Sequence, residues 1–140
     1  MKVIIINGPN LNLLGTREPS VYGNESFDIF FAKLQKSFPR IELIYYQSNV
    51  EGLLIDKIHE YGFSVDAILL NAGGYTHTSI ALSDAIAAVS SPCIEIHISQ
   101  PAAREEFRHK SMISGVCSAS ISGFGLDSYR LALNSLMKEY

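Results

Sequence analysis

Short aliphatic runs alternate along this chain with longer segments in which apolar residues recur at every third or fourth position. A run of about four to eight apolar residues that ends at a turn-forming residue is typical of a buried strand, and the wider spacing is typical of a helix with one apolar face. The runs predict strands at residues 2–7, 41–47, 67–71, 93–97 and 116–121. The periodic segments predict helices at about 26–37, 50–61, 79–89 and from 127 onwards.

The ends of the predicted helices follow from residues with known capping preferences. Pro39 closes the first helix, whose apolar face is rich in phenylalanine. Gly62 follows the second helix, at a position where a left-handed C′ residue is expected. Asp127 is expected to cap the last helix.

Five strands that alternate with helices, each apolar along nearly its whole length, predict a parallel sheet with helices on both faces. For five strands we expect the flavodoxin-like order 2-1-3-4-5, and therefore an α/β fold of that kind. No repeat or linker interrupts residues 1–140, so we expect a single domain. In this order strands 1, 3 and 4 are neighbours, and ligands bind beyond their carboxyl ends.

Composition and charge narrow the function classes. Hydrophobic residues make up 47% of the 140 residues and charged residues 18%, which suits a globular chain with a full core. The net charge of −3 and the pI of about 5.7 argue against a nucleic-acid partner. No apolar run approaches the roughly 18 residues of a membrane span, and Met1–Ile6 is too short for a signal peptide. We therefore expect a cytoplasmic protein in which Cys93 and Cys117, on separate strands, are buried thiols.

The connection after the first strand is long for an α/β unit, at roughly 18 residues where about 2–6 are usual. Gly15 and Gly23 bracket the part that carries Arg17 and Tyr22. A phenol has a pKa near 10, and lowering it by ~2 units requires ~2.7 kcal/mol, which one or two close guanidinium charges supply. The loop is therefore a candidate lid that holds a tyrosinate base. The alternative is that Tyr22 only packs and Arg17 is solvated.

Polar side chains also follow the third strand. Asn71 and His77 flank Gly73–Gly74, a pair that permits close approach of the backbone, and a helix N-terminus follows. This arrangement suits an anionic or hydroxylated ligand. Plain helix capping by the hydroxyl residues within 76–79 is the alternative, but it does not explain Asn71 and His77 together.

The fourth strand ends with Glu95 and His97, which lie two residues apart and so share one face of the sheet. A carboxylate beside an imidazole fixes its tautomer and raises its pKa, which prepares the ring to donate a proton. The alternative is a structural ion pair. The charged run at 104–110 is expected to be a solvated helix face.

These features belong to five longer motifs that occur in order along the chain. They are Asn7–Gly15 with Arg17-Glu18-Pro19 and Tyr22-Gly23, Gln47-Ser48-Asn49 with Glu51-Gly52, Asn71-Ala72-Gly73 with Thr76–Ser79, Glu95–Ser99, and Arg104–Arg108. Together, at these spacings, they resemble the type II 3-dehydroquinate dehydratases. The resemblance runs almost from end to end.

The resemblance implies an enzyme that needs no cofactor or metal and dehydrates 3-dehydroquinate to 3-dehydroshikimate through an enolate. By motif, Tyr22 would be the base that removes a proton beside the ketone, and Arg17 would hold it as phenolate. Asn10 would position the water that hydrogen-bonds the enolate oxygen. His97, oriented by Glu95, would protonate the departing hydroxyl.

The resemblance also implies how substrate is held. Asn71, His77 and Arg108 would contact the ring hydroxyls, and Ile98 with Ser99 would hold the carboxylate. Asp84 would reach the site from a neighbouring chain, because the family assembles as trimers stacked into a homododecamer. The family serves aromatic amino acid biosynthesis in the shikimate pathway, and the same reaction in quinate breakdown is an alternative.

The sequence departs from the family pattern in two places. Ser83 stands where many relatives carry arginine, and Gln100-Pro101 replaces a common asparagine. These departures bear on contacts between chains and on local loop shape, and neither touches the proposed acid or base.

Other functions are less well supported. A phosphate-binding module would need a loop rich in glycine and serine where Pro9 stands, and a receiver domain would need acidic residues where Asn7 and Asn10 stand. No G-x-S-x-G elbow supports a serine hydrolase. The four histidines match no common metal spacing, and no lysine lies at a strand end that faces the crevice, as a Schiff-base mechanism would need. A binding module descended from the enzyme is the main non-enzymatic rival, and the intact Tyr22, Arg17 and His97 argue against it.

Overall fold

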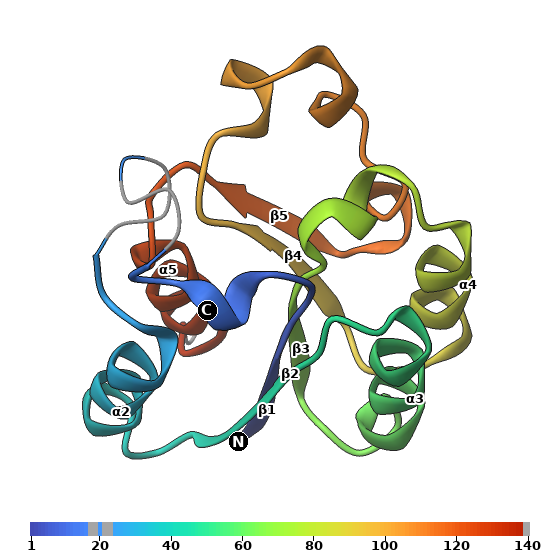
Figure 1. Ribbon diagram of the computed structural model, residues 1–140. Helices are drawn as coiled ribbons and strands as arrows, with labels where there is room; N and C mark the ends of the chain where they lie inside the picture. The colour runs from blue at the N-terminus through green and yellow to red at the C-terminus, as the bar shows by residue number, and fades with distance from the viewer. Residues whose placement is uncertain (17–19, 21–23, 139–140) are drawn as a thin grey trace.

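The computed structural model describes residues 1–16, 20 and 24–138 and contains a five-stranded sheet with helices on both sides (Figure 1). The strands run in the order β2-β1-β3-β4-β5, and every neighbouring pair is parallel. The strands are β1 Lys2–Asn7, β2 Glu42–Gln47, β3 Ala67–Asn71, β4 Cys93–His97 and β5 Ala119–Ser122, and the helices are α2 Phe27–Ser37, α3 Glu51–Tyr61, α4 Ile80–Ala88 and α5 Asp127–Leu136. The predicted flavodoxin-like α/β fold and strand order are confirmed.

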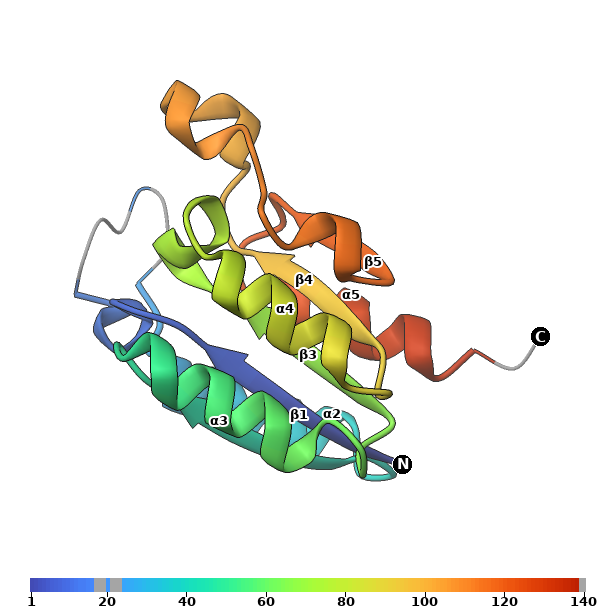
Figure 2. The same ribbon diagram turned by 90° about the vertical axis from the view of Figure 1, so that its right-hand side faces the viewer.

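The two faces of the sheet bury separate apolar clusters because successive side chains of a strand point to opposite sides. Val3 and Ile5 of β1 pack with α2 and α5, whereas Ile4 and Ile6 pack with α3 and α4. Figure 2 shows the sheet between these two helical layers. Burial on both sides explains why the central strands are aliphatic throughout. Among the described residues, no helix is long and apolar enough to span a bilayer.

Two helices begin at serine caps, and two predictions about helix ends are wrong. The Ser26 and Ser79 hydroxyls accept hydrogen bonds from the backbone at the starts of α2 and α4. Gly62 has a φ of −66°, so it is not left-handed, and its small size matters because a Cβ there would lie 2.4 Å from Val89. Asp127 is the first helical residue of α5 rather than its cap, where its charge suits the positive end of the helix dipole.

The fifth strand begins later than predicted. Residues Ser114–Val116 form a 3-10 turn, and β5 begins at Ala119 after Ser118 N–H bonds the Cys93 carbonyl at 2.8 Å. Cys117 therefore does not lie on a strand, which corrects its predicted position. The Cys117 thiol lies beside that of Cys93. A hydrogen bond between the two thiols, together with burial, raises the pKa of the Cys93 thiol. Both cysteines are free.

The register at the carboxyl end of the sheet prepares the site. Asn7 pairs with Gln47 on one side and with Asn71 on the other, so three amide side chains end three adjacent strands. The segments that follow β1, β3 and β4 project beyond this edge (Figures 1 and 2).

Candidate active site

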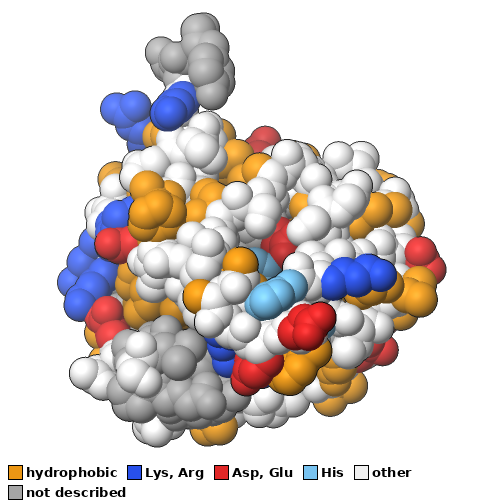
Figure 3. All heavy atoms as spheres, turned by 90° about the horizontal axis from the view of Figure 1, so that it is seen from above, with side chains coloured by type: hydrophobic (Ala, Val, Ile, Leu, Met, Phe, Trp, Pro, Cys, Tyr) orange, Lys and Arg blue, Asp and Glu red, His pale blue; other side chains and the backbone are white. Residues whose placement is uncertain are grey.

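A cavity lies at the carboxyl ends of β1, β3 and β4, where the fold predicts a ligand to bind. Its lining comes from the three segments after these strands: Pro9, Asn10 and Leu11; Asn71, Gly73, Gly74 and His77; and His97, Ile98, Ser99, Pro101, Arg104 and Arg108. Viewed from above, histidine, acidic and basic side chains gather near the middle of this face (Figure 3).

The floor of the cavity is held by a buried chain of polar contacts. The Tyr129 hydroxyl donates to Asn7 Oδ1 at 2.7 Å and accepts from Asn71 Nδ2 at 3.1 Å. Asn71 Oδ1 accepts from the Gly73 N–H at 3.2 Å. Burial raises the pKa of Tyr129 far above its ordinary value, so its hydroxyl keeps its proton and remains a donor. Both ends of the Asn71 amide are therefore fixed in direction.

The turn after β1 and the turn after β3 meet at the mouth of the cavity. A Cβ on Gly8 would lie 2.6 Å from the Ala72 carbonyl oxygen, and Gly73 has a φ of +59°, so the close approach depends on glycine at both positions. The predicted role of Gly73 is confirmed, whereas a Cβ on Gly74 would meet nothing within 4 Å. Asn10 is itself left-handed, with a φ of 70°, and its N–H bonds Asn49 Oδ1 at 2.9 Å.

His77 presents a defined nitrogen to the cavity. Its Nδ1 lies 2.7 Å from the Lys110 carbonyl, which can only accept, so Nδ1 carries the hydrogen and Nε2 is left for a ligand. Its ring lies 6.5 Å from that of His97, at an interplanar angle of 19°. Helix capping, the alternative for this segment, also occurs, but Ser79 provides it. Neither Asn71 nor His77 serves as the cap, and both line the cavity.

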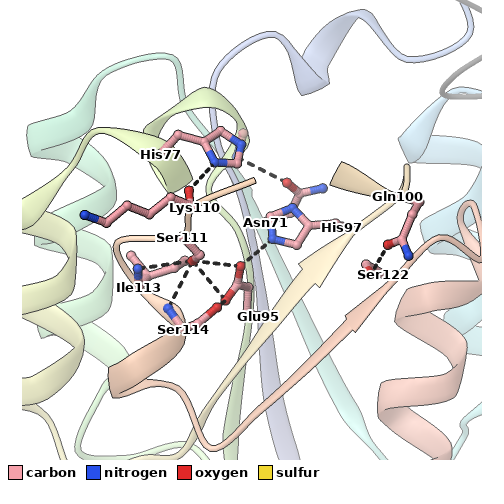
Figure 4. A network of polar contacts seen from close by, with 11 residues as sticks. Asn71, His77, Glu95, His97, Gln100, Lys110, Ser111, Ile113, Ser114 and Ser122 are labelled. Carbon is pink, nitrogen blue, oxygen red and sulfur yellow. Dashed lines mark hydrogen bonds and ion pairs between the residues drawn. The ribbon is translucent and has the colours of Figure 1, made fainter. Parts of the chain in front are cut away.

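Glu95 and His97 form a buried pair, as their spacing predicted. His97 Nε2 lies 2.5 Å from Glu95 Oε2, and the side chains are only 11% and 2% exposed. The Ser111 hydroxyl bonds both oxygens of the same carboxylate, and the Ser114 hydroxyl bonds Oε1 (Figure 4). Burial by itself raises the Glu95 pKa, but the hydrogen bonds from His97, Ser114 and Ser111 outweigh it, so the pKa lies below its ordinary value. The carboxylate is ionised and leaves His97 Nδ1 for chemistry.

The segment 104–110 is not the solvated helix face that the sequence suggested. It contains the short 3-10 turn Glu106–Arg108, and both Arg104 and Arg108 line the cavity. Arg104 Nη1 donates to Ser99 Oγ at 3.2 Å, and Arg108 Nε donates to Glu105 Oε2 at 2.6 Å. The turn packs against the turn Gly73–His77 that follows β3, and no local pattern along the chain indicated this contact.

The other predicted site residues fall in different places. Ile98 is buried and Ser99 lines the cavity beside it. Asp84 is exposed on α4 and lies outside the cavity lining. Arg17 and Tyr22 lie outside the described residues. Sequence reasoning missed Arg104, Ser111, Ser114 and Tyr129 as candidates. Only Arg104 carried a signal, through its place in the Arg104–Arg108 motif.

The fold and the site together define a flavodoxin-like α/β protein with a buried carboxylate–imidazole pair at its ligand cavity. The model of the family "Dehydroquinase class II" matches residues 1–137. The chain is 50% identical over 141 residues to a 3-dehydroquinate dehydratase of Exiguobacterium, covering all of this chain and 97% of that protein. It is 52% identical over 138 residues to one of Caldicellulosiruptor bescii, covering 96% and 95% of the two chains.

Solved structures agree with this match. A type II dehydroquinase from Butyrivibrio crossotus superposes with a TM-score of 0.94 at 46% identity, over 99% of this chain and 98% of that one. One from Propionibacterium acnes gives 0.90 at 37% identity, over 96% and 94%. The chain belongs to the class II dehydroquinase family.

Proposed function

We propose that this chain removes water from 3-dehydroquinate to give 3-dehydroshikimate, as a hydro-lyase of the shikimate pathway. Its relatives are named 3-dehydroquinate dehydratases at about half identity over nearly their whole length. The observation that carries the proposal is the buried Glu95–His97 pair at the cavity, since elimination of a hydroxyl needs a proton donor at the leaving oxygen.

The reaction proceeds in two proton transfers. Tyr22, held as phenolate by Arg17, takes the proton from the carbon beside the ketone, and the electron pair moves to the ketone oxygen to form the enolate. A water positioned by Asn10 hydrogen-bonds this oxygen. His97 Nδ1 then gives its proton to the leaving hydroxyl as the carbon–oxygen bond breaks, and water departs. Proton exchange with solvent resets Tyr22 and His97 without a cofactor.

Substrate binding uses the remaining lining residues. Asn71, His77 and Arg108 hold the ring hydroxyls, and Ile98 with Ser99 holds the carboxylate. The fixed amide of Asn71 and the free Nε2 of His77 support these roles, because each offers a polar atom of known direction.

We also propose a homo-oligomer, a dodecamer built from trimers, in which Asp84 completes a neighbouring site. The exposed position of Asp84 on α4, away from the cavity of its own chain, supports this arrangement. The free thiols of Cys93 and Cys117 fit the reducing cytoplasm.

The test is enone formation from 3-dehydroquinate, followed by ultraviolet absorbance with purified protein. A binding module would produce no enone. Tyr22→Phe removes the base and is expected to lower kcat by about 10²–10⁴-fold while substrate still binds. Turnover at the native rate in this variant would show that Tyr22 is not the base.

A further inference from the structure

Besides His97, the Glu95 carboxylate is bonded by two serine hydroxyls from the segment that follows the turn Glu106–Arg108. Ser111 Oγ lies 3.1 Å from Glu95 Oε2 and 3.3 Å from Oε1. The Ser114 hydroxyl bonds Oε1. Figure 4 shows Glu95 between the two serines and His97.

The direction of the Ser111 contact is fixed by its other bonds. Its oxygen accepts from the Ile113 N–H at 3.2 Å and from the Ser114 N–H at 3.1 Å. A hydroxyl has one hydrogen and two lone pairs, and both lone pairs are used. Its hydrogen must therefore point to Glu95, and it has no lone pair left for a protonated carboxyl. Ser111 is therefore a donor to Glu95, and a donor stabilises an ionised carboxylate more strongly than a protonated carboxyl.

We propose that Ser111 and Ser114 are positioning residues for the acid: they hold Glu95 ionised and oriented, which keeps the shared proton on His97 and its Nδ1 directed at the substrate. The inference rests on the proposed role of His97 as the acid.

The physical basis is a choice between two arrangements of the same protons. In one, Glu95 is a carboxylate and His97 an imidazolium, which is an effective acid. In the other, Glu95 is protonated and His97 is neutral, which is a poor acid. Donors aimed at the carboxylate stabilise the first arrangement selectively. A water molecule in place of the Ser111 hydroxyl could turn to donate or accept, so it would not make the selection.

Other titratable groups face the pair and stay in place when the serines change. They are His77 from the turn after β3, Arg108 and His109 from the turns after β4, and Cys93 on β4 itself. Because these groups are common to all the variants below, a difference between variants reports on the serine hydroxyls.

The experiment is the pH dependence of kcat and KM for Ser111→Ala, Ser114→Ala and the double variant. Loss of a charge-assisted hydrogen bond is expected to lower kcat about tenfold in Ser111→Ala, and further in the double variant, with little change in KM. Glu95 must be ionised, so activity falls as the pH drops through its pKa. Losing donors raises that pKa, so the acidic limb of kcat is expected to move up by about one pH unit.

Two further variants separate this role from simple packing. Ser111→Thr keeps the hydroxyl, so the acidic limb of its kcat profile is expected at the native pH. Ser118→Ala removes a hydroxyl that bonds the carbonyl of Cys93, on the same strand as Glu95, at 3.0 Å. This variant is expected to leave the acidic limb of kcat at its native pH. Should Ser111→Ala fail to fold, the exposed Ser114 provides the deciding variant.

A measurement without turnover completes the test: the Glu95 carboxyl pKa by carbon-13 NMR, with Glu95→Gln to assign the signal. An unchanged carboxyl pKa and an unchanged acidic limb in folded single and double variants would overturn the inference. Native turnover in His97→Gln would instead refute the proposed acid, whatever the serine variants show.

Discussion

At the scale of single residues, the two histidines of the cavity offer opposite ring nitrogens. His77 uses Nδ1 to bond the Lys110 carbonyl and leaves Nε2, whereas His97 uses Nε2 to bond Glu95 and leaves Nδ1. The partner determines which nitrogen is available: a carbonyl on Nδ1 leaves Nε2 of His77, and a carboxylate on Nε2 leaves Nδ1 of His97. In the proposed function, one residue type therefore serves for binding at His77 and for proton donation at His97.

Replacing Glu95 with Gln tests the charge of this pair. The amide keeps the size of the side chain but cannot stabilise an imidazolium, so kcat is expected to fall about 10²-fold or more, with KM changed far less. Steady-state kinetics provides the measurement. A kcat within about twofold of the native value would rule out the carboxylate as a partner of the acid.

The same variant has an expected effect on stability against pH. The Glu95 pKa is lowered on folding, so its contribution is present above the ordinary value of 4.5 and is lost as the pH falls through the folded pKa. The urea midpoint of the native protein is therefore expected to drop more steeply below about pH 5 than that of Glu95→Gln. Equal slopes would mean that the carboxylate is not stabilised by folding.

At the scale of elements, helix α5 supplies a side chain to the cavity floor, which lies at the ends of strands distant from it in the sequence. Tyr129 extends from α5 to the ends of β1 and β3, where its hydroxyl joins Asn7 to Asn71. The turns after these two strands are in contact as well, at Gly8 and Ala72. The cavity floor therefore depends on contacts between elements more than on any one loop.

Replacing Tyr129 with Phe removes the shared hydroxyl. Asn71 Nδ2 and Asn7 Oδ1 lose a buried partner, so the free energy of unfolding is expected to fall by about 1–3 kcal/mol. KM is expected to rise because the Asn71 amide is free to turn. The matched control is Tyr46→Phe, which removes the hydroxyl of a tyrosine on β2 whose ring lies beside the Lys57 ammonium. Both variants are compared by urea unfolding and by kinetics. A native KM in Tyr129→Phe would mean that Asn71 is oriented without it.

Gly8 tests the contact between the turns. In Gly8→Ala the added Cβ would meet backbone atoms of Ala72, so the turns must separate, and a loss of about 1–3 kcal/mol together with reduced activity is expected. Gly52→Ala, in helix α3 with nothing within 4 Å, is expected to stabilise the protein by about 0.5–1 kcal/mol. Thermal unfolding compares the two, and equal effects would contradict the close approach.

At the scale of the whole molecule, the cavity lies at the carboxyl ends of the strands, whereas Asp84 is exposed on α4 outside the lining of that cavity. A residue of one chain that completes the site of another makes activity depend on assembly. This dependence can be tested with chains that are each defective at one position.

Asp84→Asn and His97→Gln chains are expected to be nearly inactive alone. After dissociation and joint reassembly in equal amounts, about a quarter of the sites would combine an intact His97 with an intact neighbouring Asp84, and activity should return in that proportion. Light scattering checks the oligomer. Failure of the mixture to recover, or full activity of Asp84→Asn alone, would exclude the shared site.

The sequence by itself determined what depends on neighbours along the chain. The bounds of β3 and β4 were predicted to the residue, because a doubly covered strand must be apolar throughout. Glu95 and His97 were paired correctly, because alternate residues of a strand share a face. Only the tertiary structure decided which distant groups hold the site residues. Ser111 and Ser114, which bond Glu95, lie 16 and 19 residues from it, and Tyr129, which bonds Asn71, lies 58 residues from it. Such contacts depend on how distant segments pack, and serine or tyrosine in a loop or helix carries no local pattern that reveals its partner.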